Sequence, residues 1–243
     1  MKPDNQLVLC LLVFFFGVLS GHLILAGYLD IQPEDSLPAL TTLLAAFLGA
    51  WAAYRLQDRK EIRKEFDRQV AFGNDAIAAL IDNMHQLQFY QSINIDPFRH
   101  DKHRWIKILP PEFDFEPNFK LNIANLNFFW SAGNSKIVFE LSKELFSLRL
   151  LLNNINKRSE IYSKSVLPKL ESIGFVGSGE VTTTQLDEVL GKAIVHELKR
   201  ITDDIVEHLD ITISNHLRIA NELFHELKKL HPGKKILHVS LKG

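Results

Sequence analysis

Residues 37–68 read LPALTTLLAAFLGAWAAYRLQDRKEIRKEFDR, and the rest of the chain is organised around this stretch. Its first part, residues 37–54, is an uncharged apolar run with the length that a helix needs to cross the hydrocarbon core of a bilayer. No turn signal separates this run from the strongly basic residues that follow. The pattern predicts a membrane-spanning helix that continues as a charged helix beyond the bilayer.

A second apolar run comes earlier in the chain. Residues 7–29 read LVLCLLVFFFGVLSGHLILAGYL, with Ser20 and His22 as the polar interruptions. The competing interpretation is a cleaved signal peptide, but the run is longer than a usual signal-peptide core and no clear small-x-small cleavage site precedes Asp30. We expect residues 1–54 to form a two-helix transmembrane hairpin, with spans at about 7–29 and 37–54.

Basic residues predict the orientation of this hairpin, because loops rich in lysine and arginine stay on the cytoplasmic side. The connector at residues 30–36 has none, whereas six follow the end of the second span. These membrane-proximal basic residues are Arg55, Arg59, Lys60, Arg63, Lys64 and Arg68. We expect both termini to be cytoplasmic and the basic residues to contact anionic lipid head groups.

Small residues recur at helical spacing in both expected spans. They are Gly17 and Gly21 in the first, and Ala45, Ala46, Gly49, Ala50 and Ala53 in the second. Since apolar burial does not drive helices together in lipid, close approach at small residues supplies the packing. The second span offers two adjacent small rows, one for the first span and one for a neighbouring subunit. The alternative is that both rows serve the pairing within one chain.

Residues 55–93 are expected to form a juxtamembrane helix that packs into the domain after it. Its core-facing residues recur at intervals of three and four, with one interval of seven, the pattern of a helix that packs on other helices. They are Ile62, Phe66, Gly73, Ile77, Leu80, Met84 and Leu87. The pair Gly73-Asn74 predicts a kink or a break in this helix.

Residues 94–243 are expected to form an all-α cytoplasmic bundle with the juxtamembrane helix. Apolar periodicity predicts a short helix over 121–129 that stops near Gly133, a core helix from about 135 to 162, and a long helix from about 182 to 230. Leu167-Pro168 and the glycine-rich residues 174–179 predict a break between the last two.

The connector after Asn94 is the candidate partner contact. Its first half holds Arg99, Lys102, Arg104 and Trp105, which can pair with phosphates and stack on a base of single-stranded nucleic acid. A long loop inside a compact domain is more often functional or mobile than idle. The competing interpretation is a structural loop whose aromatic side chains fix it to the core and whose basic and acidic halves attract each other.

The sequence predicts no enzyme, no cofactor and no metal site. Its lone cysteine, Cys10, excludes an intramolecular disulfide and a multi-cysteine zinc site. His196, His208, His216 and His225 lack the four-residue spacing that places two ligands on one helix face. The glycines near residue 177 lack the lysine-serine ending of a phosphate loop, and no nucleophile or carboxylate pair stands out.

Residues 44–56, LAAFLGAWAAYRL, belong to the second of two expected amino-terminal spans and run into a charged helix. This layout, with an all-helical remainder, resembles the two-pass membrane effectors of bacterial phage-defence loci, notably those beside retron reverse transcriptases. The resemblance implies a toxin-like inner-membrane protein that a partner holds inactive until infection, and that then disrupts the membrane in an abortive infection response. The implied partner is a reverse transcriptase with its nucleic acid. No functional residue is transferred.

Two other classes of function stay open beside this antiviral defence role. One is a non-enzymatic, membrane-anchored helical adaptor or signalling module, and the other is an enzyme with a helical site that carries no familiar motif. Overexpression separates an effector from an adaptor, since an effector depolarises the cell. In either case the bilayer and a protein or ribonucleoprotein are the expected partners, and the small-residue rows suggest a homo-oligomer.

Overall fold

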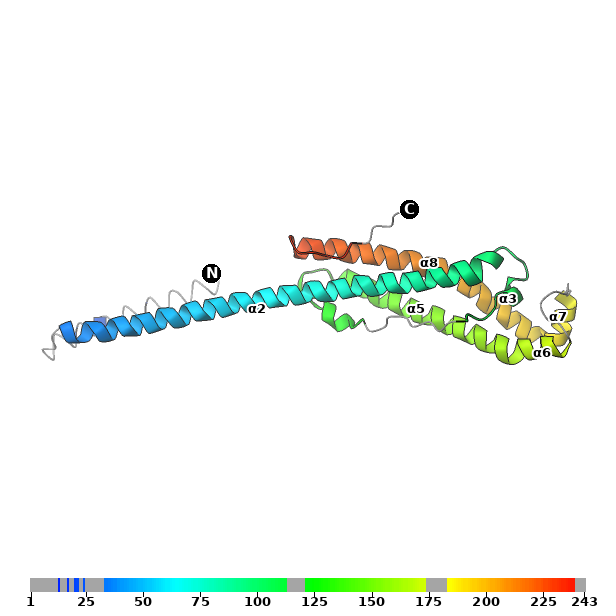
Figure 1. Ribbon diagram of the computed structural model, residues 1–243, viewed down its shortest axis with the longest axis horizontal. Helices are drawn as coiled ribbons and strands as arrows, with labels where there is room; N and C mark the ends of the chain where they lie inside the picture. The colour runs from blue at the N-terminus through cyan, green and yellow to red at the C-terminus, as the bar shows by residue number, and fades with distance from the viewer. Residues whose placement is uncertain are drawn as a thin grey trace. The chain divides into compact units, whose positions relative to one another are not determined.

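The computed structural model describes residues 33–112, 121–173 and 183–238, together with Val13, Gly17, Ser20, Gly21 and Ile24. Every regular element in these residues is helical, which confirms the predicted all-α class (Figure 1). The chain divides into two compact units, unit 1 at Met1–Lys64 and unit 2 at Glu65–Gly243.

The membrane hairpin is not established by the structure. Within the part of the chain that is described, no helix combines the length and the apolar character that crossing a membrane requires. The first expected span, residues 7–29, lies outside the described residues except at the five positions named above, and the side chains of residues 33–37, 39 and 40 are also not described. The two spans stay a prediction.

The longest helix is α2, which runs over Pro33–Tyr90 and passes through Gly73-Asn74 without interruption. The expected break there is wrong. Gly73 is buried, and a Cβ atom built on it would overlap Cδ1 of Leu227. Glycine at this position therefore permits the close approach of α8 to α2, and it does not mark the end of a helix.

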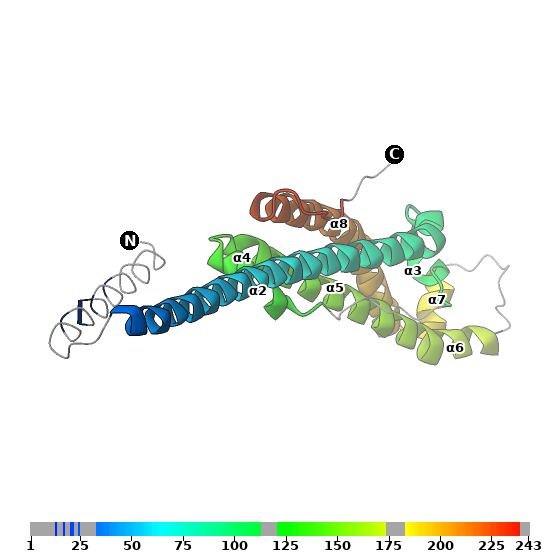
Figure 2. The same cartoon turned by 60° about the vertical axis from the view of Figure 1, so that its left-hand side comes forward.

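Three long helices form the core of unit 2. They are the second part of α2, α5 (Ser135–Ile161) and α8 (Lys192–Leu230), which lie against one another in both views (Figures 1 and 2). The shorter elements are η1 (Gln91–Ile95), η2 (Asp96–Phe98), α3 (Arg104–Lys107), η3 (Ile123–Leu126), α4 (Phe128–Ser131), η4 (Tyr162–Val166), α6 (Leu167–Ser172) and α7 (Thr183–Leu190).

The apolar residues of the three long helices meet in two successive clusters. In the first, Ile77 and Leu80 of α2 pack with Leu141 of α5 and with Ile219 and Leu223 of α8. The second cluster contains Leu87, Tyr90, Leu148, Leu152, Ile205 and Leu209. A third cluster joins η4, α6 and α7 to α8 through Val166, Leu170, Leu186, Leu190 and Leu198. Burial at intervals of three and four follows the sequence pattern.

The structure corrects two expected boundaries. Leu167-Pro168 does not end the helical path after α5, because the π-helical turn η4 leads into α6 and the proline occupies the first turn of α6, where it costs no hydrogen bond. The long helix expected from residue 182 is two helices. Gly191 separates them with φ of +87°, a conformation that favours glycine.

Candidate functional site

The small residues proposed for membrane packing are exposed or have open space beside them in the described part of the chain. A Cβ atom added at Gly17, Gly21 or Gly49 would meet nothing within 4 Å. Ala45, Ala46, Ala50 and Ala53 are exposed on α2. In the described part of the chain these faces are open to a partner helix, and the expected pairing of the two spans stays a prediction.

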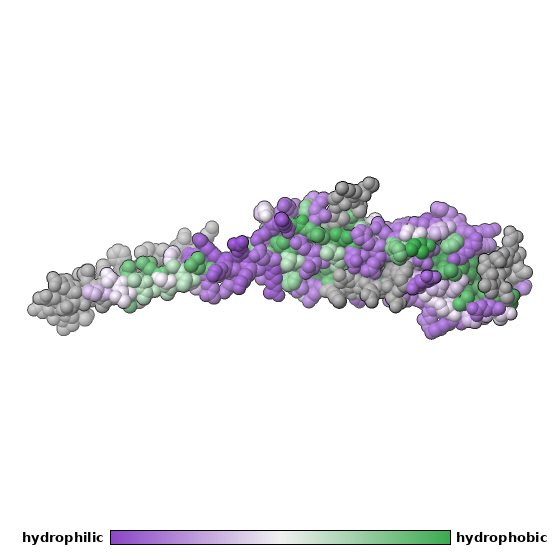
Figure 3. All heavy atoms as spheres, viewed as in Figure 1, coloured by the Kyte–Doolittle hydropathy of each residue, from purple (hydrophilic) through white to green (hydrophobic). Residues whose placement is uncertain are grey.

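The membrane-proximal basic residues are displayed along α2. Arg59, Lys60, Arg63, Lys64 and Arg68 are exposed. Arg55 is half-buried, with its guanidinium 5.7 Å from the centre of the Trp51 ring. In Figure 3 the first part of α2 is coloured green and white and the following part purple, so the helix changes from apolar to hydrophilic along its length. The expected contact with lipid head groups stays a prediction.

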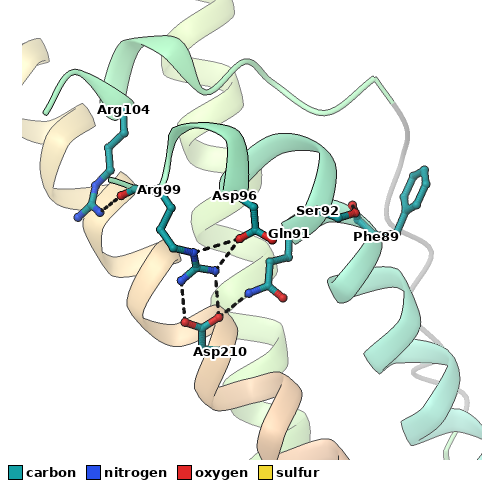
Figure 4. A network of polar contacts seen from close by, with 7 residues as sticks. All are labelled: Phe89, Gln91, Ser92, Asp96, Arg99, Arg104 and Asp210. Carbon is teal, nitrogen blue, oxygen red and sulfur yellow. Dashed lines mark hydrogen bonds and ion pairs between the residues drawn. The ribbon is translucent and has the colours of Figure 1, made fainter. Parts of the chain in front are cut away.

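The basic half of the connector folds onto α8 instead of extending outward. Arg99 contacts Asp210 of α8 through both terminal nitrogens, with Nη1 2.7 Å from Oδ2 and Nη2 3.1 Å from Oδ1 (Figure 4). It also pairs with Asp96 at 3.0 Å. Hydrogen bonding to Asp210 raises the pKa of Arg99 above its usual value. Gln91 donates a further hydrogen bond to Asp210 at 2.5 Å. The Asp210 carboxylate therefore links both η1 and the connector to α8.

The other three predicted contact residues have different positions. Arg104 bonds Oδ1 of Asp203 at 2.8 Å and the carbonyl oxygen of Arg99 at 2.8 Å, which again links the connector to α8 and to itself. Trp105 is only 3% exposed, and Nζ of Lys199 lies 5.2 Å from its ring centre. Of the four side chains, all in the described residues, Lys102 alone is classed as exposed. These positions favour the structural interpretation of the loop, and the partner contact stays a prediction.

Arg158 of α5 binds the backbone of the connector. Its side chain is buried, and its Nη2 donates to the carbonyl oxygens of Trp105, at 3.0 Å, and Ile108. Its Nε donates to Oγ1 of Thr202 on α8 at 2.9 Å. One guanidinium therefore joins α3, α5 and α8. Among the described residues Arg158 takes part in no ion pair, so backbone carbonyl dipoles receive its charge.

Two tyrosines share this buried environment. The centre of the Tyr162 ring lies 5.8 Å from the Arg158 guanidinium carbon. Burial raises the pKa of Tyr90 to about 12, and the nearby charge of Arg158 opposes that rise. Burial also raises the pKa of Tyr162 and lowers the pKa of Arg158. Both tyrosines are neutral at physiological pH, so neither supplies a formal negative charge to Arg158.

A buried polar layer lies between the first two apolar clusters. Nδ1 of His216 is 3.0 Å from Oε1 of Glu144 and 2.9 Å from the carbonyl oxygen of Thr212. A carbonyl can only accept, so Nδ1 carries the proton. Nε2 is buried and has no hydrogen-bond partner among the described residues. Asn83 of α2 is also buried, and it lies in sequence between Leu80 of the first cluster and Leu87 of the second. It is the third polar residue of this layer.

Sequence reasoning missed both Arg158 and the pair of Glu144 and His216. A readable signal existed, because Glu144 and Arg158 fall on the same face of α5 as Leu141, Leu148 and Ile155. A charged residue at a core position of a helix requires a buried partner. Nothing in the sequence shows which residues provide it.

Comparisons of the chain with protein-family models, with curated proteins and with solved structures gave no match. What the site does is therefore argued from its geometry. The network of Arg99, Arg104 and Arg158 holds the connector against α5 and α8 and leaves Lys102 exposed.

Proposed function

We propose that the protein is a non-enzymatic, two-pass membrane effector of a bacterial anti-phage system, which a partner holds inactive and which disrupts the inner membrane when activated. One observation carries the proposal. In unit 1, Leu43, Leu48 and Tyr54 of α2 are 54%, 52% and 64% exposed, directly before the run of exposed basic residues. Large apolar side chains gathered on one exposed helix are typical of a surface that meets a membrane or a protein.

The proposed topology places both termini in the cytoplasm. The connector at residues 30–36 lacks basic residues, and Arg59, Lys60, Arg63 and Lys64 are free to contact anionic lipid because their side chains are exposed. A reporter fused after Gly243 should be active only as a cytoplasmic protein. Activity of a periplasmic reporter at that position would contradict the topology.

Membrane damage is proposed to require self-association of the second span. A single hairpin is too small to enclose an aqueous path, so a leak needs several copies. Small residues are how membrane helices approach closely. An added Cβ at Gly49 would meet nothing within 4 Å, and Ala53 is exposed.

Unit 2 is proposed to be the regulatory part. Its three apolar clusters come from residues of unit 2 alone, so its fold does not need unit 1 to complete a core. A separately packed unit can bind a partner and restrain the spans through α2. The resemblance implies that this partner is a reverse transcriptase with nucleic acid, and Lys102 is an exposed basic residue of the connector available for it.

The second candidate function is a membrane-anchored helical adaptor. It is favoured by the connector itself, whose arginines are committed to Asp203 and Asp210 and give a rigid surface suited to binding. An adaptor uses the same topology but does not depolarise the cell. The two functions therefore differ in one measurable property.

The test is the membrane potential of cells after induced expression. Gly49→Leu with Ala53→Leu adds bulk to one face of the second span and keeps it apolar, so insertion should survive while depolarisation slows. Leu44→Phe adds bulk to the opposite face and is the matched control, with membrane levels checked by fractionation. A parent protein that inserts without depolarising cells supports the adaptor. A double variant that depolarises cells as fast as the parent excludes this face as the assembly surface.

A further inference from the structure

A cleft with a volume of about 500 Å³ opens in unit 2 where the start of its α2 segment, α4 and the end of α8 meet. Figure 2 shows these three helices in one view. Its size falls in the range of small-molecule sites, which runs from roughly 300 to 1,000 Å³. No residue of the connector network lines it.

Aromatic rings form much of the lining. The rings of Phe66 and His231 are 5.5 Å apart in an edge-to-face arrangement, and the ring of Phe128 is 6.4 Å from that of His231. The Phe66 side chain is 47% exposed although it belongs to this ring cluster, so one aromatic surface is open to a ligand. Leu230, also exposed, adds an aliphatic wall.

The charge of the lining has a single sign. Glu65 is the one acidic or basic side chain among the lining residues, and its carboxylate accepts a bond from Gln69 at 3.1 Å. The ion pairs between described residues do not include Glu65. Lys234, whose charge acts on His231, is paired with Asp67 at 2.5 Å. Burial lowers the pKa of His231, so its ring is neutral at neutral pH.

We propose that this cleft binds a small organic cation, an alkylammonium whose charged end lies against the rings of Phe66 and Phe128 near Glu65 and whose alkyl chain packs on Leu230. The negative faces of aromatic rings attract a cation within about 6 Å of the ring centre. A carboxylate without a cationic partner adds attraction of the same sign. An anion gains neither interaction, and a neutral ligand gains only the apolar contact. The inference does not depend on the proposed function.

The experiment measures binding to the full chain in a mild non-ionic detergent at neutral pH. The probe is butylammonium chloride, followed by ligand-observed NMR, with butanol and butyrate as the neutral and anionic isosteres. Butylammonium should bind several-fold more tightly than butanol, and butyrate should not bind. Equal binding of butanol and butylammonium would overturn the proposal, because it would show a merely apolar cleft.

Two variants locate the binding. Glu65→Gln keeps the bond geometry with Gln69 possible and should weaken butylammonium about threefold, and Phe66→Leu should do the same because it keeps apolar bulk but removes the ring. Glu207→Gln, an exposed carboxylate of α8 outside the cleft, is the matched control and should change nothing. If Glu207→Gln weakens binding as much as Glu65→Gln, the cation binds non-specifically to acidic residues on the protein surface, and the proposal fails. Circular dichroism checks the folding of each variant.

The ammonium has two sources, a free amine or the ethanolamine head group of a lipid. The full chain is placed in nanodiscs with the same anionic lipid fraction and either phosphatidylethanolamine or a neutral galactolipid as the remainder. Weaker butylammonium binding in phosphatidylethanolamine discs identifies the lipid head group as the occupant. Equal binding in both identifies a free amine, and absence of binding in both overturns the site.

Discussion

Nη2 of Arg158 lies 3.0 Å from the backbone carbonyl oxygen of Trp105, and this bond ties the core helix α5 to the connector. The same nitrogen donates to the carbonyl oxygen of Ile108, so two carbonyl groups of the connector depend on one side chain. Carbonyl oxygens buried in this way have no water to replace the lost donor. The position of the connector is therefore determined at Arg158 more than at the surface ion pairs.

The first prediction follows from this bond. Arg158→Met keeps an unbranched side chain but leaves the carbonyls of Trp105 and Ile108 without their donor, and should lower the free energy of unfolding by about 3 kcal/mol or more. Urea unfolding of the full chain in detergent, followed by circular dichroism, measures the change. Arg99→Gln removes a partly exposed ion pair and should cost about 1 kcal/mol or less. Equal small losses in both variants would show that the buried bond is not the anchor.

The second prediction concerns alkaline pH. The pKa of Tyr90 is raised from 10.0 to about 12 in the folded protein, so folding favours its neutral form. This contribution to stability is complete below pH 10 and is lost as the pH rises through 12. It should amount to about 2 to 3 kcal/mol. Urea unfolding between pH 9 and pH 12 should show a decline that is smaller in Tyr90→Phe. An identical decline in both proteins would contradict the raised pKa.

The apolar seams of α2, α5 and α8 could be predicted from the sequence because burial recurs every three or four residues along each helix. The residues that these helices contact could not be predicted from the sequence. Gly73 looks like a helix breaker in isolation, and its role depends on Leu227, which is distant in sequence. The connector arginines look available for phosphate, and their partners Asp203 and Asp210 lie about a hundred residues away. The local sequence pattern predicts which residues are buried or charged, but it does not predict which distant residues they contact.

The third prediction tests the contact between Gly73 and Leu227. Alanine in place of Gly73 brings a Cβ atom against a fully buried leucine side chain, and overpacking of this kind costs about 1 to 3 kcal/mol. Alanine also favours a helix over glycine by about 1 kcal/mol. Gly73→Ala should therefore be neutral to destabilising in the parent and stabilising by about 1 kcal/mol in a Leu227→Ala background. Additive effects in this double-mutant cycle would mean that the two residues do not touch.

The fourth prediction separates the connector's structural role from a partner contact. Changing Arg99, Lys102, Arg104 and Trp105 together would remove a buried tryptophan and should destabilise unit 2, so lost binding would be uninformative. Lys102→Glu changes only the exposed residue and should leave stability within about 0.5 kcal/mol of the parent. Its co-purification with the natural partner from the native host is the measurement. Unchanged recovery would show that Lys102 makes no contact with the partner. The charge-matched control is Lys136→Glu, which changes an exposed lysine of α5.

The last prediction concerns the segment after α8, which Asn74 holds against α2. Oδ1 of Asn74 accepts the backbone N–H of Leu237 at 2.8 Å, and its Nδ2 donates to the carbonyl oxygen of Lys235 at 3.4 Å. Asn74→Ala removes both bonds and should speed hydrogen exchange at the Leu237 amide about fivefold, which corresponds to the loss of about 1 kcal/mol. Asn74→Asp keeps the acceptor and should preserve most of the protection. Exchange that is equally fast in the parent and both variants would mean that Asn74 does not hold the segment.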